Sequence, residues 1–152
     1  MIRNGVILLV EDNADDIELT ARAFGKSNIA NEIVVVTDGQ QALDYLFAEG
    51  AYVGRDPQRF PEVVLLDLKL PKLDGLDVLR RLREDVRTRR LPVVILTSSN
   101  EEQDVCRSYD LGANSFVRKP VDFGEFLDAA RQLGLYWLVM NATPPSSPRT
   151  SL

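Results

Sequence analysis

Hydrophobic residues are concentrated in five short runs along the chain, and most of these runs are rich in β-branched side chains. The runs are GVILLV at 5–10, EIVVV at 32–36, EVVLL at 62–66, PVVIL at 92–96 and SFV at 115–117. Nearly continuous apolar runs of this length are typical of strands that are buried on both faces of a parallel sheet. The pattern therefore predicts five parallel strands.

The segments that follow the runs place apolar residues at helical spacing. These residues are Ile17, Ala21 and Phe24; Ala42, Leu43, Leu46 and Phe47; Leu76, Leu79, Leu82 and Val86; Val105, Tyr109 and Leu111; and Phe123, Phe126, Leu127, Ala130, Leu133 and Trp137. Strand and helix thus alternate five times, which predicts an open, doubly wound α/β domain with right-handed crossovers. In such folds the ligand site lies beyond the carboxyl ends of the strands.

Two stretches fall outside this alternation. Residues 48–62 are punctuated by Gly and Pro and exceed a usual helix-to-strand connection, so we expect a surface loop. Residues 141–152 are rich in Pro, Ser and Thr, and we expect a mobile polar tail. We therefore assign one domain to residues 1–140, with no effector domain after it.

Composition narrows the possible functions. The chain has 152 residues, of which 45% are hydrophobic, enough for one core. A net charge of -5 argues against nucleic-acid binding, which needs a basic surface. The apolar run Val6–Val10 is too short for a membrane span or a secretory signal, so we expect a cytoplasmic protein. The absence of histidine excludes histidine-based zinc sites and Ser-His-Asp catalysis.

Acidic residues follow the first apolar run at once, as Glu11, Asp12, Asp15 and Asp16. They have two interpretations: acids that suit the positive end of a helix dipole, or ligands of a cation. Other polar groups would reach the same edge of the sheet. They are Asp38 after the second run, Asp67 after the third, Thr97 and Ser98 after the fourth, and Lys119 after the fifth.

These groups suit one kind of chemistry. Asp12 and Asp67 could hold Mg²⁺, which favours one or two carboxylates together with water and phosphate oxygens. A carboxylate can also attack phosphorus and form an aspartyl phosphate. Mg²⁺ and the Lys119 ammonium would neutralise the oxygen charge, and Thr97 could donate to the phosphoryl group.

Four motifs carry a resemblance to a known family. They are LVEDN at 9–13, LLDLKLPKLDG at 65–75, ILTSS at 95–99 and FVRKPVD at 116–122. With these motifs in order over roughly residues 6–140, the chain resembles the CheY-like receiver domain of two-component response regulators. The resemblance implies a flavodoxin-like (βα)5 sheet with strand order 2-1-3-4-5, and a signalling domain rather than an enzyme.

The resemblance also implies a role for each matching residue. Asp67 would be the phosphoacceptor, Asp12 a direct Mg²⁺ ligand and Glu11 a second acid that acts through metal-bound water. The backbone carbonyl of Lys69 would be a further ligand, and Lys119 would pair with the phosphoryl oxygens. The Lys69 side chain would either regulate dephosphorylation or lie in solvent.

Thr97 and Phe116 would form the switch pair that changes the face made by the last two helices and the strand between them.

The long loop before Pro61, the phrase RTRRLPVVILTSS and the segment LGLYWLVMN resemble the single-domain regulators of bacterial phytochromes. This narrower resemblance implies a light-regulated histidine kinase as phosphoryl donor. We interpret Asp15, Asp16 and Asp38 as first-turn or loop acids outside the site.

The last predicted helix carries a second apolar stripe of Leu135, Leu138, Val139 and Met140, which another surface should cover. We expect a homodimer through the last strand and its neighbouring helices, with cover by the chain's own surface as the alternative.

Two other functions are compatible with parts of this pattern. A haloacid-dehalogenase-like phosphatase needs a second acid at the position of Lys69, and the chain lacks it. The stronger alternative is a receiver-fold interaction module that acts without phosphorylation.

Overall fold

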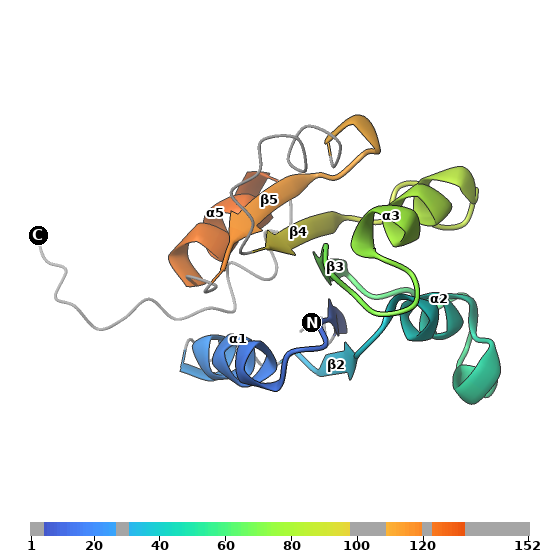
Figure 1. The fold of residues 1–152 in the computed structure, drawn as a ribbon, viewed down its shortest axis with the longest axis horizontal. Helices are drawn as coiled ribbons and strands as arrows, with labels where there is room; N and C mark the ends of the chain where they lie inside the picture. Colours follow the sequence, from blue (N-terminus) through green and yellow to red (C-terminus); the bar gives the residue numbers. More distant parts are fainter. Residues whose placement is uncertain (1–4, 27–30, 98–108, 120–122, 133–152) are drawn as a thin grey trace, which may run out of the picture.

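The strands form one sheet in the computed structural model, which describes residues 5–26, 31–97, 109–119 and 123–132. The strands are β1 (Ile7–Val10), β2 (Ile33–Val36), β3 (Val63–Asp67), β4 (Val93–Thr97) and β5 (Ser115–Arg118). They pair in parallel in the order β2-β1-β3-β4-β5 (Figure 1). The doubly wound fold and the 2-1-3-4-5 strand order are therefore confirmed.

Helices cover both faces of the sheet. They are α1 (Ala14–Lys26), α2 (Gly39–Phe47), the 3-10 helix η1 (Gly50–Tyr52), α3 (Gly75–Glu84) and α5 (Phe123–Gln132). In Figure 1, α1 and α5 lie on one side of the sheet and α2 and α3 on the other. The helix expected on Val105, Tyr109 and Leu111 lies largely outside the described residues.

Alternation along β1 divides the core into two layers, because successive strand side chains point to opposite faces. Ile7 and Leu9 belong to the cluster under α1 and α5, where the rings of Phe24 and Phe126 lie 4.8 Å apart between centroids. Leu8 and Val10 belong to the cluster under α2 and α3. The sheet is thus packed between α1 and α5 on one face and α2 and α3 on the other.

Burial departs from the sequence expectation at the edges of the sheet. All residues of β1 and β3 are buried, as expected. Val35 of edge strand β2 is 37% exposed and Phe116 of edge strand β5 is only half-buried, because each of these strands has only one neighbour in the sheet. Val86 was expected on the buried stripe of the third helix, but α3 ends at Glu84 and Val86 is 72% exposed.

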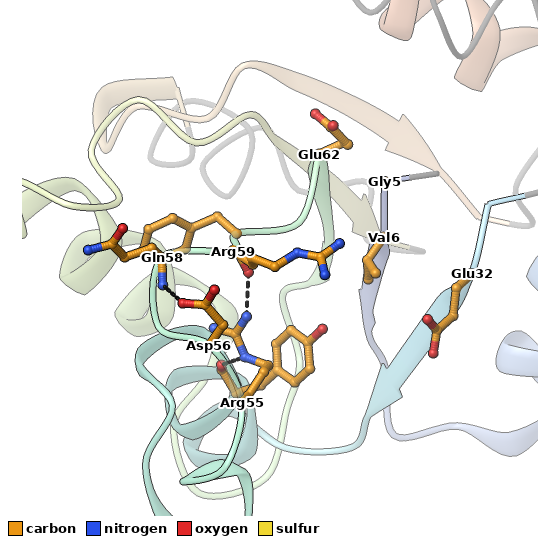
Figure 2. Close-up of a pocket in the computed structure, with 10 residues that line it drawn as sticks. Gly5, Val6, Glu32, Arg55, Asp56, Gln58, Arg59 and Glu62 are labelled. Carbon is orange, nitrogen blue, oxygen red and sulfur yellow. Dashed lines mark hydrogen bonds between the residues drawn. The ribbon is translucent and has the colours of Figure 1, made fainter. Parts of the chain in front are cut away.

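The Arg55 side chain ties the 48–62 loop to α2, in addition to the backbone hydrogen bonds within the loop. The Arg55 guanidinium donates to the carbonyl oxygens of Tyr45 at 2.7 Å, Leu46 at 2.9 Å and Arg59, and it lies 4.4 Å from the centre of the Tyr45 ring. The loop borders a pocket of about 400 Å³ at the amino ends of β1 and β2, where Figure 2 shows Val6 and Arg59. This pocket lies at the opposite edge of the sheet from the carboxyl ends.

Within the part of the chain that the structure describes, we find no helix whose length and apolar character would let it span a membrane.

Candidate functional site

Three carboxylates meet at the carboxyl ends of β1 and β3. Glu11 and Asp12 follow β1, and Asp67 is the last residue of β3. Because β1 and β3 are neighbours in the sheet, their ends lie together, and one carboxylate oxygen from each acid lies within 4.8 Å of the others. Glu11 and Asp67 are buried, whereas Asp12 is exposed. The sequence prediction that these acids converge is met by the geometry.

Lys119 brings a positive charge to these acids from the far edge of the sheet. It follows β5, and its Nζ lies 2.5 Å from Glu11 Oε1 and 3.3 Å from Asp67 Oδ2. Only 9% of its side chain is exposed. Lysine side chains are mostly exposed to solvent, so a lysine that is buried among carboxylates is unusual. Its position matches the expectation for the strand-end amine.

Asp16 also contacts Lys119, which corrects the interpretation that it lies outside the site. Its Oδ2 is 3.0 Å from Lys119 Nζ. It occupies the first turn of α1, as expected, and its backbone N–H donates to Asn13 Oδ1 at 3.0 Å. The Asn13 N–H in turn donates to Glu11 Oε2 at 3.1 Å. Because α1 begins three residues after Glu11, its first turn reaches over the strand ends.

Burial and charge shift the ionisation of this cluster. Burial raises the pKa of both Glu11 and Asp67 above the ordinary carboxyl range, although hydrogen bonding and charge from Lys119 oppose the shift. Burial would lower the pKa of Lys119, but its hydrogen bonds to Glu11 and Asp16 and the charge of Asp67 raise it above its ordinary value. Lys119 therefore remains an ammonium, while the two buried carboxylates are destabilised.

The acid cluster fits a hard divalent cation. Its donors are carboxylate oxygens, with no sulfur or imidazole among them, and Mg²⁺ and Mn²⁺ favour such ligands. A cation would also relieve the repulsion that Lys119 leaves uncompensated between Glu11, Asp12 and Asp67.

The loop after β3 is packed tightly against two helix starts. The Gly75 N–H donates to Leu68 O at 2.9 Å, and the Gly39 N–H donates to Pro71 O at 3.4 Å. A Cβ on Gly39 would lie 2.2 Å from Leu73 O, so only glycine fits there without movement. The loop that carries Lys69 is thus fixed on both sides, and the Lys69 side chain itself is exposed.

Asp38 acts as a helix cap, in agreement with the sequence interpretation. Its side chain accepts a hydrogen bond from the Gln41 N–H at 2.8 Å at the start of α2. It also lies 3.6 Å from Lys72 Nζ, which joins the cap to the loop after β3. Asp15 is exposed in the first turn of α1.

Other predicted residues are only partly described. Thr97 ends β4 opposite Arg118 in the parallel register. Phe116 in β5 is half-buried and packs against the core under α2 and α3. The apolar stripe of Leu135, Leu138, Val139 and Met140 and the 141–152 tail lie outside the described residues.

The sheet order, the two helical layers and the acid cluster at the strand ends together define a receiver-type α/β domain. The family model of the response regulator receiver domain matches residues 7–131. The chain belongs to this family.

The chain is also similar to individual response regulators and to another regulatory protein. The chain is 55% identical to the bacteriophytochrome response regulator AtBRR, with a TM-score of 0.81, over 89% of this chain and 96% of that one. It is 35% identical to the Mn²⁺-bound form of response regulator Rcp1, with a TM-score of 0.73, over 93% and 99%. It is 41% identical to the probable methanogenesis regulatory protein FilR2 of Methanothrix harundinacea, over 91% and 87%.

Proposed function

We propose that this chain is a single-domain response regulator that accepts a phosphoryl group on Asp67 from a histidine kinase. The observation that carries the proposal is the position of Lys119 Nζ, 3.3 Å from Asp67 Oδ2, with Glu11 and Asp12 beside the same carboxylate. A buried carboxylate next to a fixed ammonium and two further acids suits phosphoryl transfer, in which charge on the transferred oxygens must be neutralised.

The transfer uses the residues of the cluster in distinct ways. A carboxylate oxygen of Asp67 forms the new P–O bond while the P–N bond of the donor phosphohistidine breaks. Lys119 pairs with the phosphoryl oxygens. Asp12, Asp67 and the Lys69 backbone carbonyl would hold Mg²⁺ directly, and Glu11 would act through metal-bound water. When bound, Mg²⁺ supplies further neutralising charge, and the Mn²⁺-bound form of Rcp1 supports a divalent cation in this family.

Phosphorylation would be communicated through Thr97 and Phe116. The Thr97 hydroxyl would move toward the phosphoryl group, and the Phe116 ring would fill the space that it leaves. The responding face comprises β5, α5 and the helix predicted on Val105, Tyr109 and Leu111. The half-buried position of Phe116, beside the core rather than in solvent, supports such a movement.

The partners are proposed from chemistry and resemblance. The likeness to AtBRR supports a bacteriophytochrome as the histidine kinase. A homodimer would form through the same face and through Leu135, Leu138 and Val139. Residues 1–140 would form the cytoplasmic receiver domain.

One experiment tests phosphoacceptance. The intact mass is measured after incubation with Mg²⁺ and a small acyl phosphate, for the wild type and for Asp67→Asn, followed by transfer from phosphorylated candidate kinases. We expect one Mg²⁺-dependent phosphoryl adduct on the wild type and none on Asp67→Asn. No adduct with any donor would contradict the proposal and favour the phosphorylation-independent interaction module.

A further inference from the structure

The Lys119 ammonium makes three acidic contacts, and each carboxylate comes from a different structural element. Glu11 follows β1 and lies at 2.5 Å, Asp16 is in α1 at 3.0 Å, and Asp67 ends β3 at 3.3 Å. A lysine ammonium has three N–H donors and no acceptor. Three carboxylates at these distances can therefore use all three donors, so a new acceptor must displace one of them.

Two of these three carboxylates would change partners during the proposed reaction. Glu11 belongs to the acid cluster that would hold the cation, and Asp67 would become the phosphorylated group. Asp16 lies outside that cluster. Its backbone is fixed by the Asn13 side chain, so it stays beside Lys119 when the other two acids are engaged. It would remain as a competitor of the phosphoryl oxygens for the ammonium.

We propose that Asp16 is a positioning residue that withholds part of the Lys119 charge from the phosphoryl group and so slows phosphorylation of Asp67. This inference rests on the proposed phosphoacceptor function. Removal of the Asp16 charge leaves the ammonium free to pair with the incoming phosphoryl oxygens.

A comparison with Asp15 distinguishes the proposed role of Asp16 from the general effect of an acid at a helix N-terminus. Both acids lie in the first turn of α1, where a negative charge suits the helix dipole. Asp15 is exposed and makes no ion pair with Lys119, whereas Asp16 contacts the ammonium and is only 31% exposed. Asp15→Asn therefore removes the same charge from the same turn and is the matched control.

The test compares phosphorylation rates of the wild type, Asp16→Asn, Asp16→Glu and Asp15→Asn. Intact mass is followed over time with saturating Mg²⁺ and a small acyl phosphate, and thermal unfolding verifies that each variant is folded. We expect Asp16→Asn to react roughly threefold to fivefold faster, the scale of one partly exposed ion pair. Asp16→Glu retains a carboxylate and should return toward the wild-type rate, while Asp15→Asn keeps the wild-type rate.

A double-mutant cycle shows whether the effect passes through Lys119. In a Lys119→Gln background, Asp16→Asn should no longer accelerate phosphorylation, because no ammonium remains to be released. Equal acceleration in both backgrounds, equal acceleration by Asp15→Asn, or slower reaction of Asp16→Asn would each overturn the inference while the phosphoacceptor function stands. A wild type without any adduct would remove the phosphoacceptor function itself, and this inference with it.

Discussion

A Cβ atom on Gly75 would lie 2.3 Å from the backbone carbonyl oxygen of Asp67. The first residue of α3 thus packs directly against the backbone of the proposed phosphoacceptor, at a distance that no side chain can occupy. The helix start and the end of β3 therefore hold each other in place, and the Asp67 carboxylate is presented from a rigid support.

Gly75→Ala should destabilise the fold, because the helix start or the β3 end must shift to accept the methyl group. We expect the free energy of unfolding to fall by about 1 to 3 kcal/mol, measured by urea denaturation. Gly25→Ala is the control, since a Cβ at Gly25 in α1 meets nothing within 4 Å. It should leave stability unchanged or raise it by up to about 1 kcal/mol.

Asp67→Asn should stabilise the metal-free protein at neutral pH. Burial raises the pKa of Asp67 in the folded protein, so the protonated carboxyl favours the folded state and the ionised carboxylate favours the unfolded chain. The contribution of the protonated carboxyl to stability is therefore lost as the pH rises through the folded-state pKa. A neutral amide avoids this penalty, and we expect a gain of about 1 kcal/mol in denaturation experiments. The gain should shrink toward acidic pH, where the wild-type carboxyl is protonated.

Mg²⁺ should stabilise the wild type more than Asp67→Asn. A ligand that binds only the folded state at ten times its dissociation constant adds about 1.4 kcal/mol. Thermal unfolding with and without Mg²⁺ measures the difference, with Ca²⁺-free buffer and added chelator as the reference. An equal response of both proteins would mean that the cation binds elsewhere.

Arg83 should contribute more to stability than its exposed neighbours on α3. Its guanidinium donates to Gly112 O, Leu91 O and Asn114 Oδ1, each at 2.8 Å, and so joins α3 to the segments before β4 and β5. Arg83→Lys cannot reproduce this fork and should cost about 2 to 4 kcal/mol. Arg80→Lys, which changes only an exposed ion pair with Asp77, should cost less than about 1 kcal/mol.

Arg55→Ala should loosen the 48–62 loop without affecting phosphorylation. The substitution removes three hydrogen bonds to backbone carbonyls and the contact with the Tyr45 ring. We expect roughly tenfold faster amide exchange in this loop by mass spectrometry. Arg59→Ala keeps the carbonyl that Arg55 uses and should exchange like the wild type. Slower phosphorylation of Arg55→Ala would show that the two edges of the sheet are coupled.

Leu138→Asp should convert the proposed dimer into a monomer with an intact fold. A charge on the second apolar stripe would disfavour its burial against another copy. Light scattering gives the mass, and circular dichroism tests the fold. A variant that keeps a dimer mass would exclude this surface as the interface.

The strands were predictable because their apolar runs are local in sequence, whereas the exceptions depend on distant neighbours. The exposure of Val35 follows from the position of β2 at the edge of the sheet, and the exposure of Val86 follows from the end of α3 at Glu84. The sequence reasoning missed the contact of Asp16 with Lys119 because the two residues are 103 positions apart. A helix that starts immediately after a site strand was the signal that could have revealed it.

The strand-end rule identified Glu11, Asp12, Asp67 and Lys119 because parallel strands that share a sheet bring their carboxyl ends to one edge. It could not distinguish how deeply each acid is buried. That property depends on the packing of α1 and of the loop after β3 over the edge.

Because Lys119 follows β5, the acids at the strand ends are synthesised well before the lysine that pairs with them. The three acids that contact Lys119 belong to the first half of the sequence, and Lys119 itself follows β5, the fifth strand along the chain. A nascent chain that has reached β4 therefore carries the acids without their counter-ion, and repulsion opposes early closure of this edge. Addition of β5 completes the five-stranded sheet and brings the Lys119 ammonium to these acids, so the folded edge is electrostatically balanced only when β5 is part of the domain.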